Sequence, residues 1–318
     1  MHKFLLVTFL GLVATLGGCE KAGAKSSGPL AAEDLSLFHD LPGGNVALIG
    51  GNYMKMQDFM QSSLGQLTQR LMDKATSHAE GFAKWMKCFT EIKDLRIAGG
   101  VALAKGVEAR LVFKGMSVQQ IDACAKRAGY ERTLDPDGKY IAVKLPGVGS
   151  TTMEAGYLQL PDGALYSRQR FEIALVPTVA PAARGELEAD VAGLAKASAA
   201  DDKALLALAA KVDRTKTMWF TGSGANTPAA SKVGDVYGSI DIDSGIKLDI
   251  TVAFKDQALA KQIEDGLAQA RKMSDRMPAE VRSLLDHVEL HRDGGTVRFV
   301  ANVTDTQLKA LTQLSGAF

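Results

Sequence analysis

A strict alternation of side chains over residues 239–254 constrains the fold of this chain more than any other feature. Apolar residues take every second position on both sides of a turn at Ser244-Gly245. The apolar positions are Ile240, Ile242, Ile246, Leu248, Ile250, Val252 and Phe254, and between them stand Asp241, Asp243, Lys247, Asp249 and Thr251. A period of two is typical of a β-strand with one buried and one solvated face. The pattern therefore predicts a hairpin in an antiparallel sheet.

The same order of predicted elements occurs twice along the chain. Each half shows a short helix, a strand closed by glycines, a variable segment, a hairpin, a second helix and two further strands. In the first half these are 33–41, 46–49, 52–89, 95–113, a helix from Ser117, and strands 139–145 and 156–167. In the second they are 202–213, 218–221, 225–235, 239–254, a helix near Asp256, and strands 288–292 and 296–303. The repeat predicts an internal duplication.

We therefore expect an α+β fold with two similar halves, each an antiparallel sheet with helices packed on one face. The first half would span 33–176 and the second 201–318. Between them, residues 177–200 carry Pro177 and Pro181 ahead of an Ala-rich helical run, which is typical of a linker.

Two helix starts have capping-box spacing. Ser117 is followed by Gln120, and Thr304 by Gln307. Because each side chain can bond the backbone of the other residue, helices are expected from 118 and from 305.

Composition excludes one class of partner. The 318 residues are 46% hydrophobic, enough for a substantial core, and 37 Lys and Arg balance 36 Asp and Glu to a formal charge of +1. A chain without basic excess cannot neutralise a run of phosphates. We expect no nucleic-acid binding.

The N-terminus has the layout of a secretory signal. Lys3 precedes an apolar run from Phe4 to Val13, which is too short for the roughly 20 residues of a membrane-spanning helix. The run leads to 16–19, Leu-Gly-Gly-Cys, which resembles the lipobox of bacterial lipoproteins. That resemblance implies a signal peptide over 1–18, removed before a diacylated Cys19, and an acylated flexible tether over 19–32.

The resemblance also implies a location. Two or three acyl chains hold a protein at a bilayer almost permanently. Glu20 stands where inner-membrane retention in enteric bacteria typically has Asp, so the expected place is the outer membrane, facing the periplasm.

With Cys19 assigned to lipid, Cys88 and Cys124 remain. The envelope is oxidising, and both residues fall in helices expected to pack on the same sheet. We expect a disulfide between them; the alternative is two buried free thiols.

An apolar stripe at helical spacing runs through residues 52–89. Its members are Met56, Phe59, Met60, Leu64, Leu67, Leu71, Ala75, Phe82, Trp85, Met86 and Phe89. Such a stripe either packs on the sheet as core or, being Met-rich, forms an adaptable surface for lipid or a partner helix.

Three other motifs contain residue types that can bind metals or nucleotides. His287, Glu289 and His291 would share one face of a strand, but alternate residues lie too far apart to place all three on one zinc ion. The glycines at 222–224 could begin a nucleotide-binding loop, but Thr227 stands in the third-glycine position of that motif. Residues 135–138 are better explained as a turn than as a calcium loop. We therefore expect no catalytic, cofactor-binding or metal-binding residues.

These features favour a membrane-anchored, non-catalytic lipoprotein that binds or scaffolds another component of the envelope. Two alternatives stay open. One is a carrier or sensor of lipid or another hydrophobic ligand, with 52–89 covering a concave sheet. The other is an envelope hydrolase whose catalytic groups meet only in the fold.

Overall fold

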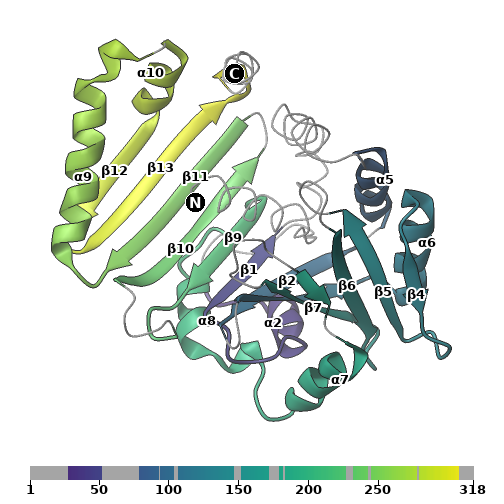
Figure 1. Ribbon diagram of the computed structural model, residues 1–318. Coiled ribbons are helices and arrows are strands. Elements are labelled where there is room, and N and C mark those ends of the chain that lie inside the picture. Colours follow the sequence, from purple (N-terminus) through teal and green to yellow (C-terminus); the bar gives the residue numbers. More distant parts are fainter. Residues whose placement is uncertain are drawn as a thin grey trace.

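The structure is a computed structural model, and it describes residues 28–51, 79–92, 94–103, 107–146, 152–171, 179–181, 183–226, 232–242, 245–277 and 279–307. Within these ranges one antiparallel sheet runs through the whole molecule, with helices against both of its faces (Figure 1).

Twelve strands follow one another across this sheet, and a thirteenth lies off the path. In spatial order they are β12 (Val288–Asp293), β13 (Thr296–Thr304), β11 (Gly245–Phe254), β10 (Val233–Ile242), β9 (Met218–Gly222), β1 (Ala47–Gly51), β2 (Arg96–Ala102), β3 (Val107–Lys114), β7 (Leu165–Phe171), β6 (Thr152–Gln159), β5 (Tyr140–Pro146) and β4 (Arg132–Leu134). The short β8 (Val179–Pro181) pairs with the end of β7.

The hairpin that the alternation predicts is confirmed as β10 and β11. Ile240 pairs with Leu248 and Ile242 with Ile246, which keeps the apolar side chains on one face. The opposite face differs from expectation at Asp241 and at Thr251, which is 8% exposed. Asp241 is buried, and its carboxylate accepts hydrogen bonds from Lys216 Nζ at 3.1 Å and the Thr217 hydroxyl at 3.3 Å. A local ion pair satisfies this carboxylate in place of solvent.

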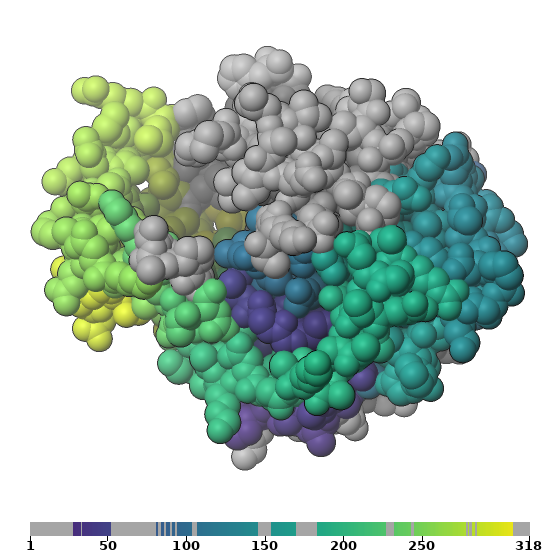
Figure 2. Space-filling view, turned by 60° about the horizontal axis from the view of Figure 1, so that its bottom comes forward, coloured from purple at the N-terminus to yellow at the C-terminus, as the bar shows by residue number. Residues whose placement is uncertain are grey.

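A single junction unites what the sequence predicts as two sheets. β1 pairs with β9 along its length, from Ala47 opposite Gly222 to Gly51 opposite Met218. Residues 28–51 accordingly lie between the teal first part of the chain and the green second part (Figure 2). The prediction of a separate sheet in each half is wrong, because the glycine-closed strands of the two halves bond to each other.

Seven α-helices lie within the described residues. They are α2 (Ala32–His39), α5 (Ala79–Thr90), α6 (Val118–Ala128), α7 (Arg184–Gly193), α8 (Lys203–Ala209), α9 (Gln257–Lys272) and α10 (Ala279–Asp286), with 3₁₀ turns at Ala199–Asp201 and Ser274–Arg276. Both predicted capping boxes are present: Ser117 and Gln120 bond reciprocally before α6, and Thr304 and Gln307 do so after β13.

Apolar side chains of the helices and the sheet form two hydrophobic cores, one on each side of the sheet. Leu111 and Phe113 on β3 face α5 and α6, whereas Val112 between them faces α2, α7 and α8. All three side chains are at most 3% exposed. The prediction that helices cover one face is therefore wrong for the first half, since a strand that is apolar at consecutive positions needs cover on both sides.

Some boundaries also differ from prediction. The strand expected over 156–167 is the hairpin of β6 and β7, because Gly163 adopts a positive φ of 91° and Asp162 bonds the amide of Ala164 to close a turn. The segment 177–200 contributes β8 and α7, and Leu187 of α7 is fully buried. Neither β4 nor α10 has a counterpart among the predicted elements.

A buried ion network fixes α7 to the sheet. Glu108 on β3 is 1% exposed and accepts from Arg168 at 3.0 Å and Arg110 at 3.3 Å. Asp190 on α7 accepts from Arg168 at 3.0 Å and from the Tyr166 hydroxyl at 2.9 Å. Burial, followed by the Asp190 carboxylate, raises the pKa of Tyr166 well above its usual range, so the phenol remains a donor. Each buried charge thus has a partner, as burial requires.

At the β1–β9 junction, Trp219 lies across Gly50 and packs edge-on against Phe38 of α2, with ring centroids 5.9 Å apart. The glycine is what leaves room for the indole. A Cβ at position 50 would lie 2.4 Å from two ring atoms of Trp219.

We predict that Gly50→Ala lowers the free energy of unfolding by about 1–3 kcal/mol, the usual cost of overpacking a filled core. Urea unfolding followed by tryptophan fluorescence measures this. Gly222→Ala is the matched control on the neighbouring strand, because its Cβ would meet no atom closer than 3.6 Å. Equal effects of the two substitutions would contradict the assigned role of Trp219.

Candidate functional site

Several residues singled out by sequence fall outside the described ranges. These include the signal segment, Cys19 and the first part of the apolar stripe, 56–75. None of the helices in the described part of the chain is long and apolar enough to cross a membrane.

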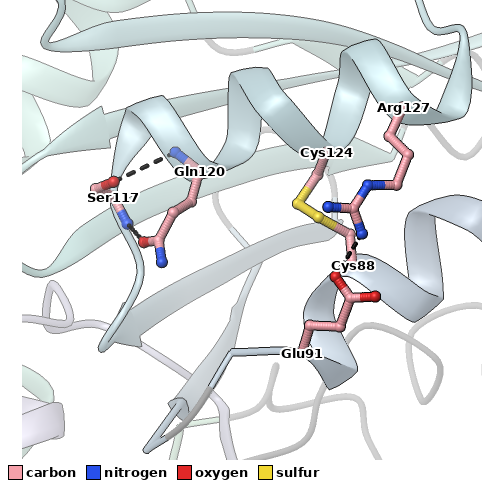
Figure 3. The surroundings of a disulfide bond; sticks show 6 residues. All are labelled: Cys88, Glu91, Ser117, Gln120, Cys124 and Arg127. Atoms are coloured by element: carbon pink, nitrogen blue, oxygen red, sulfur yellow. Dashed lines mark hydrogen bonds and ion pairs between the residues drawn. A yellow bond between two sulfur atoms is a disulfide. The ribbon is translucent and has the colours of Figure 1, made fainter.

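The structure joins Cys88 and Cys124 in a disulfide, the pair that the sequence predicts. Cys88 comes from α5 and Cys124 from α6, with their Cα atoms 5.6 Å apart, and both are buried. Figure 3 shows the bond between the two helices, the Glu91–Arg127 ion pair beside it, and the capping box at the start of α6. The bond holds α5 against a helix whose own start is set by a cap.

The described end of the apolar stripe belongs to the core. Trp85 and Phe89 are 2% and 9% exposed, and their rings pack edge-on at 5.0 Å. Trp85 also contacts Tyr130, at 5.8 Å between centroids. At Trp85 and Phe89 the stripe packs on the sheet as part of the core, which is the first of the two interpretations given above.

The polar trio near β12 is spread out. His287 precedes the strand and its ring nitrogen lies 2.6 Å from the Ser283 carbonyl, while Glu289 and His291 are exposed and 3.3 Å apart. Within the described ranges, no three His, Cys, Asp or Glu side chains are placed to hold a metal ion.

The predicted turn at 135–138 leads to a polar pocket at one edge of the sheet. It connects β4 to β5, with the Gly138 amide bonded to the Asp135 carbonyl at 2.9 Å and a positive φ of 68° at Gly138. The hairpin it closes ends the sheet. Among the described strands, β4 pairs with β5 alone, which makes it the edge strand beside α6 at the right of Figure 1.

An open pocket of about 320 Å³ lies along this edge. Its lining comes from three successive strands or their flanks and is mostly charged or polar: Glu131, Arg132, Thr133, Ala142, Lys144 and Glu154. Such a lining suits a polar or charged guest more than a lipid chain.

Charges in the pocket are partly paired. Lys144 bonds Glu131, and this contact lowers the pKa of Glu131 and raises that of Lys144. Glu154 adds a smaller upward effect on the Lys144 pKa, so the ammonium lies between two carboxylates. Arg132 is engaged by Asp122 of α6. The lining is balanced in formal charge, with Glu131 and Glu154 against Arg132 and Lys144.

Contacts from both sides hold the hairpin. From α7, Arg184 bonds Asp135 at 2.7 Å and Asp137 at 2.6 Å. The bond to Asp137 is the main reason that the pKa of Arg184 is raised. From α6, the Gln119 amide donates to the Gly138 carbonyl at 3.3 Å. These contacts within the chain fix the position of the β4–β5 hairpin.

Sequence reasoning identified the turn but missed the site that it forms. β4 has three residues, too few for a detectable alternation, and α7 lies about fifty positions downstream. The available signal was the turn motif at 135–138, followed by the predicted strand at 139–145, which together indicate a hairpin.

Comparison with known proteins places the chain in no family. No family model and no curated protein matches it. Among solved structures it is similar to one titled crystal form I of TP0453, with 9% sequence identity and a TM-score of 0.40 over 92% of this chain and 98% of that chain. A TM-score of this size does not establish a common fold.

We predict that removing the disulfide by the double substitution Cys88→Ser, Cys124→Ser lowers the free energy of unfolding by roughly 3.8 kcal/mol. This is the chain-entropy value for a loop closed across a sequence separation of 36. Thermal unfolding with and without reductant provides the measurement. Reductant should shift the midpoint of the native protein and leave that of the double variant unchanged; a shift in both would contradict the assignment.

Proposed function

We propose that this protein is a membrane-anchored lipoprotein of the bacterial envelope that binds or scaffolds another envelope component without catalysing a reaction. In this proposal residues 1–18 are a signal peptide, Cys19 carries the lipid, and the body lies in the periplasm at the outer membrane. The lipobox resemblance at 16–19 supports the anchor. The Cys88–Cys124 disulfide supports an oxidising compartment, since such bonds persist outside the cytoplasm.

The start of the body supports a short tether. The Gly28 amide bonds the Ala210 carbonyl at 2.7 Å, and Arg214 donates to the carbonyls of Gly28 and Pro29 at 2.8 and 3.2 Å. Residues 28 and 29, which the sequence assigns to the tether, are therefore attached beside α8. In this proposal the rest of the tether, 19–27, has the reach of a nine-residue linker, roughly 16 Å, which would keep the α8 end of the body close to the bilayer.

The observation that carries the binding role is the β4–β5 hairpin with its charged pocket. This edge is held from two sides by α6 and α7 and lies apart from α8 in Figure 1. Elsewhere in the described core, charged groups such as Glu108 and Asp241 are satisfied within the fold. A preorganised polar edge on an anchored body is suited to recognition.

We also propose that the two halves arose by duplication. Outward from the junction, the strand order is β1-β2-β3-β7-β6 on one side and β9-β10-β11-β13-β12 on the other. In each series the three strands nearest the junction are consecutive in the chain. The two outer strands form a later hairpin, and the second strand of that hairpin is the one that pairs with the first three. The β4–β5 hairpin extends the first series only.

The anchor is tested with Cys19→Ala. The variant should lose the acyl mass and leave the membrane fraction, because a nearly neutral body has little electrostatic attraction to anionic lipid. Fractionation and intact-mass measurement of the extracted protein follow both effects. The Cys88→Ser, Cys124→Ser variant is the control and should remain lipidated. A processed, membrane-bound Cys19→Ala protein would refute the anchor.

The binding role is tested by placing a photoreactive amino acid at Thr133 on the β4 edge, in cells that produce the full chain. Irradiation should yield a discrete covalent adduct. The same amino acid at His291, exposed on the opposite edge strand β12, is the matched control. If neither position yields an adduct, or both yield the same one, the β4 edge is not the binding surface.

A further inference from the structure

Asp40 ends α2 at a position that is unfavourable for a negative charge. It is the C-cap of this helix, where the last carbonyls form the negative end of the helix dipole. Its side chain is only 20% exposed, so water compensates the charge in part. A carboxylate in such a place is stabilised by a cation or neutralised by a proton.

One cation contacts Asp40, but a second carboxylate shares it. Lys114, the last residue of β3, places its Nζ 2.8 Å from Asp40 Oδ2. The same Nζ lies 3.5 Å from Oδ2 of Asp162, in the turn between β6 and β7, and donates to the Ser36 carbonyl at 3.2 Å. A single ammonium thus joins two carboxylates that come from different elements.

The two carboxylates also act on each other. Asp162 is within hydrogen-bonding reach of Asp40. Burial is the main cause that raises the pKa of Asp40, the Lys114 contact opposes it, and the Asp162 carboxylate adds to it. An aspartate paired with one lysine alone would shift in the opposite direction, because a nearby cation favours the charged form.

The other charged groups around α2 have partners of their own. Asp34, near the start of the helix, bonds Arg96 of β2 at 3.0 Å. His39 interacts electrostatically with Asp201 of the 3₁₀ turn that follows α7. The charges that act on Asp40 therefore come from β3 and from the β6–β7 turn.

We propose that Asp40, Lys114 and Asp162, termed the Asp40 cluster, form a pH-sensitive contact that fastens the end of α2 to the β6–β7 turn more tightly as the pH falls. At neutral pH two mutually repelling carboxylates share one ammonium, and the cluster carries one excess negative charge. One proton on Asp40 removes both the repulsion and the excess charge. The protonated group can then donate an O–H···O⁻ hydrogen bond to Asp162, which keeps Lys114 as its ion-pair partner.

The Asp40 cluster lies on the helix through which the anchor would act on the body. Residues 28 and 29, just ahead of α2, are bonded beside α8. Phe38 of α2 packs against Trp219 at the β1–β9 junction. A tighter contact at the end of α2 would hold this helix in place when the surroundings become acidic. This role rests on the proposed anchor, whereas the titration of the cluster does not.

The direction of the pH effect distinguishes this contact from an ordinary ion pair. A carboxyl group whose pKa is raised on folding binds its proton more tightly in the folded chain. Its contribution to stability is complete below the ordinary pKa of 3.8 and is lost as the pH rises through the raised pKa of the folded state. A simple pair of Asp40 with Lys114 would instead weaken on acidification.

The test measures the free energy of unfolding of the full-length protein in a non-ionic detergent, by urea denaturation between about pH 7 and about pH 4. Asp40→Asn is the main comparison, because asparagine is neutral at every pH and can still donate a hydrogen bond to Asp162. We expect the unsubstituted protein to gain stability relative to Asp40→Asn as the pH falls.

Two further variants locate the effect. Asp162→Asn should lower the pKa of Asp40, followed through its carboxyl carbon by NMR, and should remove most of the gain in stability. Asp162 is 45% exposed, so this variant should fold. Asp34→Asn is the matched control on α2: it removes the ion pair with Arg96 and should leave the gain unchanged.

A loss of stability relative to Asp40→Asn on acidification would overturn the proposal. An unchanged Asp40 pKa in Asp162→Asn, or loss of the gain in Asp34→Asn, would do the same. These measurements do not depend on the lipid. The Asp40 cluster can therefore fail with the anchor intact, and a membrane-bound Cys19→Ala protein would refute the anchor without affecting the titration.

Discussion

The antiparallel pairing of β1 with β9 is the interaction on which the rest of the structure depends. It brings residues 47–51 against 218–222, so that strands from both halves of the chain share one hydrogen-bonded sheet. Two half-sheets would each expose an edge at this point, and their pairing removes both. The close approach of Trp219 over Gly50 also brings α2 onto the junction through Phe38. The common core on that face includes residues of both halves, among them Leu48, Val112 and Trp219.

Because β1 and β9 pair at the centre of the sheet, its edges lie at the two outermost described strands. Among the described residues, one end is β12, beside α9, and the other is β4, beside α6. The disulfide and the capped α6 stabilise the region next to β4, while Arg184 of α7 holds its turn. The same contacts that stabilise the first half therefore position the proposed binding edge. A lipid at Cys19 would hold the α8 end of the body near the membrane, because the body begins at Gly28 beside α8, and the β4 edge lies apart from that end.

Local signals in the sequence were reliable wherever neighbouring residues decide the structure. The alternation at 239–254 specified the β10–β11 hairpin, Ser117 and Gln120 specified the start of α6, and the turn residues at 135–138 specified a turn. The disulfide required a longer inference, from compartment and helix placement, and the structure pairs the same cysteines. Asp241 shows where alternation is insufficient: its polar side chain suggests solvent, but Lys216 and Thr217 surround it.

The sequence by itself determined the type of element, its polarity and much of its register, because these depend on side-chain period and on contacts a few residues apart. Only the tertiary structure decided that the two predicted sheets are one, that helices cover both faces of the first half, and that β4 is an edge. Strand partners such as β1 and β9, or the turn at 135–138 and Arg184, are far apart in the chain. Backbone hydrogen bonding between strands carries no side-chain signature of which strand will be the neighbour, so that choice is made by the packing of the whole molecule.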